Sequence, residues 1–383
     1  MTKRWCQAGD KHIWVRQDWS VQLCCSLSGD SKVHRHNLAR PEHLFRYLIS
    51  PEFKEKYAKL EKGPLPAGAC SICQRMEQAT HQSSQRFKIN KLTEQGDKFF
   101  LKLDFSNKCN LKCTMCSSAR STSWIKDEQK LVKALKGDKR HDHPPHRHDN
   151  LGNEWFKKTP IEWFKNLGAV EISGGEPLYD ENALEFIEFL SINCPTIAMR
   201  LITNTTMVNK DILEILARFP KLRIICSVDA WENKTYQYVR GGIYELDEIK
   251  ENIIGLLENC NGYDSNIAIA DTIHPANYNQ TNAGRIWVTE INEKYNRGGT
   301  KRPLKYSWDY VFKPLHLDPR TVLPNNFIAG KKSLTEQINF YNFTTQLDII
   351  RKQSILDVRP EFEPWWKDME NIKNKYKESI NAV

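Results

Sequence analysis

Apolar positions between residues 97 and 312 follow two patterns that alternate along the chain. One pattern is a short run rich in β-branched and aromatic residues, which is typical of a buried strand. The other is a longer amphipathic segment. The sequence predicts six strands: FFLKLDF (99–105), AVEIS (169–173), AMRLIT (198–203), LRIICSV (222–228), NIAIADT (266–272) and YSWDYVF (306–312).

Three of the segments between these runs have the period of an amphipathic helix. DENALEFIEFLSIN opens with Asp180, a residue type that often caps a helix N-terminus. DILEILARF and ELDEIKENIIGLLENC follow later strands. The three apolar stripes consist of Leu184, Ile187 and Leu190, of Ile212, Ile215, Leu216 and Phe219, and of Ile249, Ile253, Leu256 and Leu257.

This alternation predicts an α/β fold built from parallel β/α units with right-handed crossovers. Six strands favour an open or partial (β/α)6 barrel over a closed barrel of eight. In either arrangement the active site belongs at the C-terminal ends of the strands. We therefore look for chemistry directly after each predicted strand.

The regions that flank the barrel have a different character. Residues 1–94 hold five cysteines and little periodicity apart from a predicted helix near 42–61. Residues 316–383 predict a C-terminal helical extension, whose two main helices carry Phe340, Leu347 and Ile350 and then Trp365 and Trp366. We expect a cysteine-rich module at 1–94, a barrel at 95–315 and this extension at 316–383.

A histidine-rich segment interrupts the barrel. KGDKRHDHPPHRHDN (136–150) carries His141, His143, His146 and His148 together with two prolines. Such tracts can bind metal, but nothing in the pattern fixes a ligand geometry. We interpret the segment as an exposed loop between two helices.

Charge and hydropathy indicate which partners and which compartment to expect for the protein. The 56 Lys and Arg residues against 47 Asp and Glu give a net charge of +9, spread along the chain. This permits an acidic partner such as nucleic acid, although a solvated surface with a slight basic bias explains it more simply. No run reaches the roughly 18 apolar residues of a membrane span, and no apolar run follows the charged start. We expect a cytoplasmic protein without a membrane partner.

Eleven cysteines are many for such a chain, and most of them lie in close pairs or triplets. Disulfide frameworks are typical of short secreted chains, whereas clustered cysteines without a signal peptide favour metal–thiolate chemistry. Cys194, Cys226 and Cys260 lie in helix or strand patterns, where we expect small buried core residues.

The cysteine triplet carries the strongest chemical signal. FSNKCNLKCTMCSS places Cys109, Cys113 and Cys116 in a C-x3-C-x2-C pattern just after the first predicted strand. Three thiolates can hold three corners of a 4Fe–4S cube. Structural zinc normally takes four protein ligands. The cube would keep one iron without a protein ligand, and a substrate or cofactor could bind at that iron.

This pattern resembles the radical S-adenosylmethionine (SAM) superfamily, and further motifs follow in the same order. EISGGEP, LITNTT and SVDA each end a predicted strand, and YQYVRGG (236–242) resembles the family's Y-x-x-[IV]-R. The resemblance implies SAM contacts by Gly174, Gly175 and Glu176 near the methionine amine and by Asn204 at the ribose. It also implies cofactor or substrate contacts by Ser227 and Asp229, and a place near the adenine for Met115.

The family also implies a reaction. The open iron of the cluster binds the amine and carboxylate of SAM, and one electron from the reduced cluster breaks the sulfur–C5′ bond. The 5′-deoxyadenosyl radical then abstracts a hydrogen from the substrate. A reductant such as flavodoxin or ferredoxin is the implied partner, while the protein binds, orients and excludes water.

The N-terminal cysteines resemble the auxiliary-cluster modules called twitch or SPASM. The order of Cys6, Cys24 or Cys25, Cys70 and Cys73, with Ser84 and Arg86 behind them, matches these modules. Leu23 and Trp19-Ser20 depart from the pattern, and the module here precedes the barrel. The resemblance implies a second 4Fe–4S cluster on four thiolates. A structural zinc site on the same cysteines is the alternative.

The resemblance leaves the substrate open. Twitch and SPASM proteins often modify peptides, which favours a peptide or protein side chain. The basic charge and the 13 Tyr and 11 Trp residues would also suit a nucleic acid or nucleotide, and another small molecule is a third option. The alternative of a different class is a non-catalytic iron–sulfur or zinc binding protein, which a broken triplet or GGEP would favour. Both motifs are intact.

Overall fold

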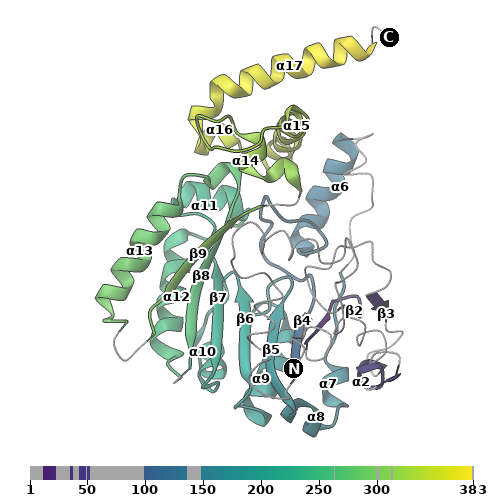
Figure 1. Cartoon of the computed structure of the whole chain (residues 1–383), viewed down its shortest axis with the longest axis vertical. Helices are drawn as coiled ribbons and strands as arrows, with labels where there is room; N and C mark the ends of the chain where they lie inside the picture. Colours follow the sequence, from purple (N-terminus) through teal and green to yellow (C-terminus); the bar gives the residue numbers. More distant parts are fainter. Residues whose placement is uncertain are drawn as a thin grey trace, which may run out of the picture.

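The structure is a computed structural model that describes residues 12–22, 35–37, 43–48, 50–51, 99–135, 148–262, 264–298, 302–311 and 314–381 (Figure 1). The predictions for Cys6, Cys24, Cys25, Cys70 and Cys73, and for the histidines of residues 141–146, fall outside these ranges. The auxiliary-cluster module and the division into three regions therefore stay predictions.

In the described part of the chain, nine strands form one sheet in the order β3-β2-β1-β4-β5-β6-β7-β8-β9. Neighbours from β4 to β9 pair in parallel, as do β1 and β4, whereas β1–β2 and β2–β3 are antiparallel. The strands are β1 (His12–Val15), β2 (Ser20–Gln22), β3 (Arg35–Asn37), β4 (Phe99–Asp104), β5 (Leu167–Ser173), β6 (Ala198–Thr203), β7 (Leu222–Ser227), β8 (Asn266–Ile273) and β9 (Lys305–Tyr310). The predicted α/β fold with a mostly parallel sheet is confirmed.

The six predicted strands are β4 to β9, with ends that differ by at most two residues where they are described. The sequence did not predict β1, which lies beside β4 with Ile13 opposite Leu101. Four residues give too short a run to establish a period. Strand β1 nevertheless buries Ile13 and Val15 completely, so residues 12–15 belong to the same sheet as the barrel strands.

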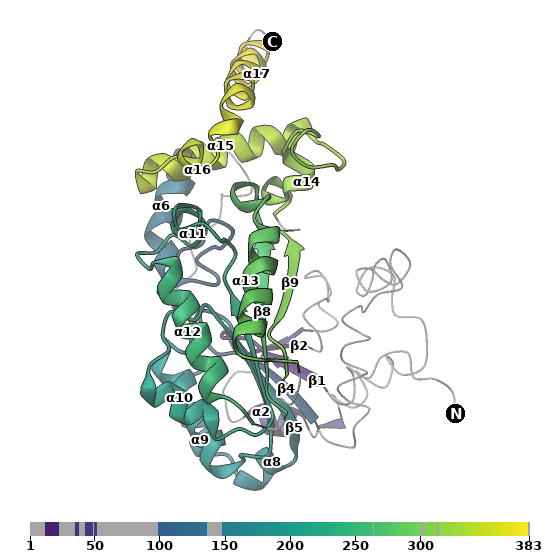
Figure 2. The same cartoon turned by 90° about the vertical axis from the view of Figure 1, so that its left-hand side faces the viewer.

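Helices connect the parallel strands and cover one face of the sheet. Figure 2 shows α9, α10 and α12 side by side along it. Before the C-terminal region the helices are α2 (His43–Leu48), α6 (Ile125–Ala134), α7 (Glu154–Lys157), α8 (Ile161–Lys165), α9 (Glu181–Asn193), α10 (Lys210–Ala217), α11 (Asn233–Arg240), α12 (Leu246–Asn259) and α13 (Thr281–Lys294). Asp180 caps α9 as predicted, since its carboxylate accepts the backbone N–H groups of Asn182 and Ala183.

The main core lies between this face of the sheet and its helices. It includes the predicted stripe residues Ile187, Leu216 and Ile253, each without exposed surface. Cys194, Cys226 and Cys260 are buried in the same core, which confirms their interpretation as small core residues.

A second core joins the C-terminal helices to α6, α11 and the cysteine loop. These helices are α14 (Pro319–Val322), α15 (Leu334–Arg351), α16 (Ile355–Val358) and α17 (Glu363–Asn381). Figure 1 shows them in yellow-green and yellow above the sheet. Helices α15 and α17 carry the residues for which two helices were predicted. In the described part of the chain, no helix is long and apolar enough to cross a membrane.

Candidate active site

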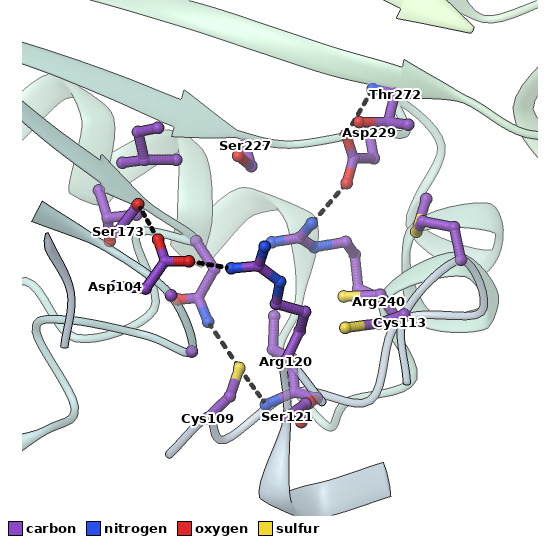
Figure 3. Close-up of a pocket in the computed structure, with 18 of the residues that line it drawn as sticks. Asp104, Cys109, Cys113, Arg120, Ser121, Ser173, Ser227, Asp229, Arg240 and Thr272 are labelled. Carbon is purple, nitrogen blue, oxygen red and sulfur yellow. Dashed lines mark hydrogen bonds and ion pairs between the residues drawn. The ribbon is translucent and has the colours of Figure 1, made fainter. Parts of the chain in front are cut away.

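A cavity of about 410 Å³ opens at the C-terminal ends of the parallel strands (Figure 3). It lies at the edge of the sheet where the strand pattern predicted the site. The predicted site residues that line it are Cys109, Cys113, Met115, Cys116, Gly174, Gly175, Asn204, Ser227 and Asp229. The fold therefore brings together, in one cavity, residues from four segments that lie far apart in the sequence.

The backbone of the cysteine loop is held in place by its neighbours. The Trp124 indole Nε1 donates to the Cys113 carbonyl at 2.7 Å, and the Ser123 hydroxyl donates to the Cys109 carbonyl at 2.7 Å. The Thr114 N–H donates to the Val239 carbonyl at 2.7 Å. With its carbonyl groups bonded, the loop can direct its thiols toward the cavity.

The three thiols fit a cluster that takes one thiolate per iron. Burial raises the pKa of Cys109 and of Cys116 to about 12 and also raises the pKa of Cys113. Without a bound cation these thiols keep their protons, so a cluster would have to displace them. Within the described ranges, no three His, Cys, Asp or Glu side chains converge on a point that could hold a single metal ion. The donor set, three thiols on one loop, matches three corners of a 4Fe–4S cube.

The GGEP turn packs directly on the cysteine loop. Gly174 and Gly175 have φ values of +84° and +48°, which favour glycine. A Cβ atom on Gly175 would lie 2.3 Å from the Lys108 carbonyl oxygen, and the Glu176 N–H donates to that same oxygen at 2.8 Å. Glycine is therefore needed here for backbone conformation and for close approach to the loop.

Glu176 lies behind the cavity instead of lining it. Its buried carboxylate accepts the Thr203 hydroxyl at 2.7 Å and the Asn204 N–H at 2.5 Å. Burial raises the pKa of Glu176, and these hydrogen bonds oppose that shift. The side chain thus joins the end of β5 to the end of β6 and positions Asn204.

Asn204 lines the cavity beside the cysteine loop. Its Nδ2 donates to the Asn110 Oδ1 at 3.0 Å and lies 3.9 Å from the Cys109 sulfur. Its Oδ1 accepts the N–H and the hydroxyl of Thr206. The amide is therefore held in one orientation between two loops.

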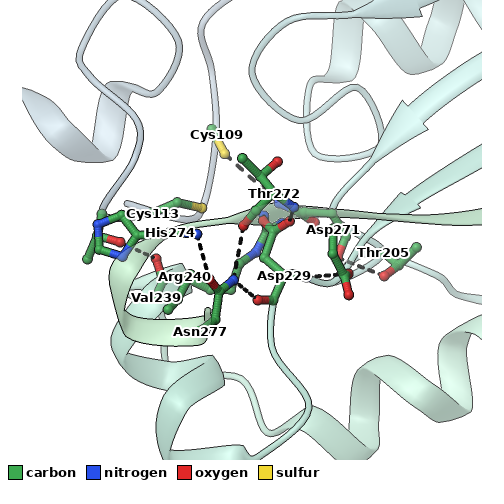
Figure 4. A network of polar contacts seen from close by, with 12 residues as sticks. Cys109, Cys113, Thr205, Asp229, Val239, Arg240, Asp271, Thr272, His274 and Asn277 are labelled. Atoms are coloured by element: carbon green, nitrogen blue, oxygen red, sulfur yellow. Dashed lines mark hydrogen bonds and ion pairs between the residues drawn. The ribbon is translucent and has the colours of Figure 1, made fainter. Parts of the chain in front are cut away.

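Asp229 is fixed at the end of β7 in an unusual backbone conformation. Its φ is +69°, a region that costs a non-glycine residue about 1–3 kcal/mol. Its N–H donates to Asp271 at 2.9 Å, its carbonyl accepts from Asn277, and its carboxylate accepts the Thr272 N–H at 2.7 Å (Figure 4). Strain held by so many contacts is typical of functional sites.

Arg240 completes this group, although the sequence assigned it no role beyond its motif. Its Nη1 donates to the Asp229 carboxylate, and the side chain is 7% exposed (Figure 3). Its Nε has no hydrogen-bond partner among the described residues. The side chain lines the cavity and brings a buried positive charge to it, which is suited to an anionic group. The only sequence feature that could have indicated Arg240 was its place as the arginine of the YQYVRGG motif.

Part of the cavity lining consists of residues that the sequence did not indicate. These residues are Trp14, Lys102, Asp104, Arg120 and Ser173. The Asp104 carboxylate accepts from Arg120 at 2.5 Å and from the Ser173 hydroxyl at 2.7 Å (Figure 3). The Trp14 ring lies 5.6 Å from the Lys102 Nζ and 5.9 Å from the centre of the Arg120 guanidinium. The one available signal was Asp104, a carboxylate at the end of a buried strand.

The sequence model of the Radical SAM superfamily matches residues 103–267, the segment that contains the cysteine loop and the next three strand ends. A search of curated proteins finds no match. Similar solved structures include Streptococcus suis SuiB bound to S-adenosylmethionine, at 14% identity over 92% of this chain and 74% of that chain, with a TM-score of 0.35. They also include HydG, a maturase of the FeFe hydrogenase, with a TM-score of 0.38. That match has 13% identity and covers 67% of this chain and 50% of that chain.

Proposed function

We propose that this chain, whose residues 103–267 match the Radical SAM superfamily, is a radical SAM enzyme that abstracts a hydrogen from a peptide or protein side chain. The observation that carries the catalytic part is the single cavity shared by the three cysteines and the ends of β5, β6 and β7. A non-catalytic scaffold would not need so many polar groups held around one space.

In this proposal Cys109, Cys113 and Cys116 hold the 4Fe–4S cluster. When bound, the cluster supplies the electron that cleaves SAM to a 5′-deoxyadenosyl radical. The chain itself binds and orients SAM. Gly174 and Gly175 offer backbone groups to the amine, Asn204 an amide to the ribose, and Ser227 a hydroxyl at the far wall. Met115 contributes an apolar surface for the adenine.

Arg240 is the group that we assign to the SAM carboxylate. It is buried, lines the cavity near Cys113 and carries a positive charge. Asp229, which also lines the cavity, binds the guanidinium. Glu176 acts indirectly in this proposal. Its carboxylate accepts the Asn204 N–H and so positions Asn204, which would contact the cofactor.

The auxiliary cluster is a separate part of the proposal. Cys6, Cys24 or Cys25, Cys70 and Cys73 would bind a second 4Fe–4S cluster, which could pass electrons to or from the substrate radical. Its support is the order of these cysteines in the sequence. The same order supports a peptide substrate, since modules of this kind often accompany peptide modification.

A specific observation favours a second candidate, a nucleotide or nucleic acid. The cavity lining combines the Trp14 indole with Lys102 and Arg120. Aromatic rings stack on bases, and cations bind phosphate. Product formation with a peptide and with a nucleotide or nucleic acid would decide between these two substrate classes.

The direct test is reductive cleavage of SAM by the anaerobically reconstituted protein. We expect the wild type to release 5′-deoxyadenosine with dithionite and Cys113→Ala to release none, because only two thiolates remain for the cluster. Cys226→Ala, which removes a buried core thiol of the same sheet, is the matched control and should retain activity. Equal release by the wild type and Cys113→Ala would refute the assignment.

A further inference from the structure

The C-terminal extension forms the back wall of the cysteine loop. Met115 and Cys116 pack against the second core, which also contains Phe340 and Leu347 of α15. Helix α15 packs on α6, the helix that follows the loop directly. The extension therefore contributes to the surroundings of the cysteines from residues more than two hundred positions later in the chain.

Arg351, at the end of α15, is buried in this wall. Its side chain is 2% exposed, and its Nε donates to the Asp127 carboxylate of α6 at 2.8 Å. Its Nη1 and Nη2 have no hydrogen-bond partner among the described residues. A buried guanidinium with two unused nitrogen atoms is costly, which suggests a function beyond packing.

The guanidinium is linked to the cysteine loop through one side chain. Its central carbon lies 4.5 Å from the centre of the Trp124 ring, and that indole donates to the Cys113 carbonyl at 2.7 Å. Trp124 is 2% exposed. Arg351 thus supports the residue that fixes Cys113, and it places its charge where little water can screen it.

The charges that interact with Arg351 include the carboxylates of Asp127 and Asp348. Asp127, its carboxylate partner, is shared with Lys112 of the cysteine loop at 3.3 Å. Only the Trp124 side chain lies between the Arg351 guanidinium and the backbone carbonyl of Cys113 along this path of contacts.

We propose that Arg351 is a positioning and electrostatic residue that raises the reduction potential of the cluster held by Cys109, Cys113 and Cys116, an inference that rests on the proposed function. Reduction adds one negative charge to the cluster, and a nearby buried cation stabilises the more negative state. The extension would then make it easier for a physiological donor to deliver the electron.

The test is a redox titration of the reconstituted protein in the absence of SAM. The midpoint potential of this cluster is read from its electron paramagnetic resonance signal. The signal absent from Cys113→Ala identifies the cluster to be titrated. We expect Arg351→Met to shift the potential to more negative values, and Arg351→Lys to restore most of it. Asp127→Asn should shift it in the opposite direction, because it leaves Arg351 and Lys112 without their shared carboxylate.

Arg359→Met is the matched control. Arg359 belongs to the same extension and is 4% exposed, but its Nε donates to the Ala276 carbonyl. The Arg359→Met variant should leave the midpoint potential unchanged. Equal midpoint potentials in the wild type, Arg351→Met and Asp127→Asn would overturn the role of Arg351 but not the proposed function. Shifts of the same sign in both variants would do the same. A wild type without any cluster would overturn the proposed function as well.

Discussion

At the scale of single residues, Asp229 and Arg240 show how the fold prepares the site before a ligand arrives. Asp229 has a left-handed backbone that Asp271, Asn277 and Thr272 hold through its N–H, carbonyl and carboxylate. Because Asp229 cannot move freely, the guanidinium that it binds is also fixed. Such preorganisation lowers the cost of ordering the site when a charged ligand binds.

Arg240→Gln should therefore weaken SAM binding to the reconstituted protein by about tenfold to a hundredfold, the loss expected for one charge-assisted hydrogen bond. Equilibrium dialysis with labelled SAM measures it. The single change also leaves Asp229 buried without its cation. The double variant Asp229→Asn/Arg240→Gln removes that complication and should bind as weakly as the single variant. Restored affinity in the double variant would show that Arg240 only neutralises Asp229.

At the scale of secondary-structure elements, the contacts of α15 could not be read from the sequence. The sequence predicts the helix, because Phe340, Leu347 and Ile350 have a helical spacing. Its partner α6 lies two hundred residues earlier, and no periodicity indicates which helices meet. Arg351 consequently looks like an ordinary basic residue in a last turn, and only the packing shows it behind Trp124.

Most of the strands, unlike the contacts of α15, could be predicted from the sequence. Strands β4 to β9 were predictable because each is a short run rich in β-branched and aromatic residues, and β5 is buried along almost its whole length, as expected in a parallel sheet. Strand β1 was not, because HIWV is too short to show a period. The motifs after the strands predicted one wall of the cavity. The wall formed by Trp14, Lys102 and Arg120 was missed, since no motif includes these residues.

Asp348 of α15 gives this element a dependence on pH. Burial raises the pKa of Asp348 to about 6, although its carboxylate accepts the Tyr238 hydroxyl and the Ile355 N–H. The folded protein therefore holds this proton more tightly than the unfolded chain. The contribution of Asp348 to stability is complete below about pH 4 and is lost as the pH rises through 6.

Asp348→Asn should remove this loss. The free energy of unfolding of the wild type should fall relative to the variant by about 2 kcal/mol between pH 4 and pH 7.5. Anaerobic urea unfolding across that range measures the difference. Asp357→Asn, at an exposed position of nearby α16, should follow the wild type. Parallel curves for the wild type and Asp348→Asn would contradict the assignment.

At the scale of the whole molecule, we expect an enzyme with two clusters and one barrel. The described residues line the cavity at the strand ends, whereas the N-terminal cysteines lie outside the described residues. The two parts are therefore best separated by their effects on different steps of the reaction.

Cys70→Ala should spare SAM cleavage and block formation of the product. The first step needs only the cluster at Cys109, Cys113 and Cys116, while the second would need electron transfer through the auxiliary cluster. The measurement is 5′-deoxyadenosine and modified substrate in the same reaction, together with iron per chain. Normal product from Cys70→Ala would mean that the N-terminal cysteines have a structural role, as a zinc site would.

The most direct measurement is the electron paramagnetic resonance spectrum of the reduced, reconstituted protein before and after addition of SAM. Three cysteine ligands leave one iron open, so SAM bound there should change the signal of the cluster that Cys113→Ala removes. We expect a clear change in that signal. A signal that is identical with and without saturating SAM would contradict it, because the cluster would then have no open iron for the cofactor.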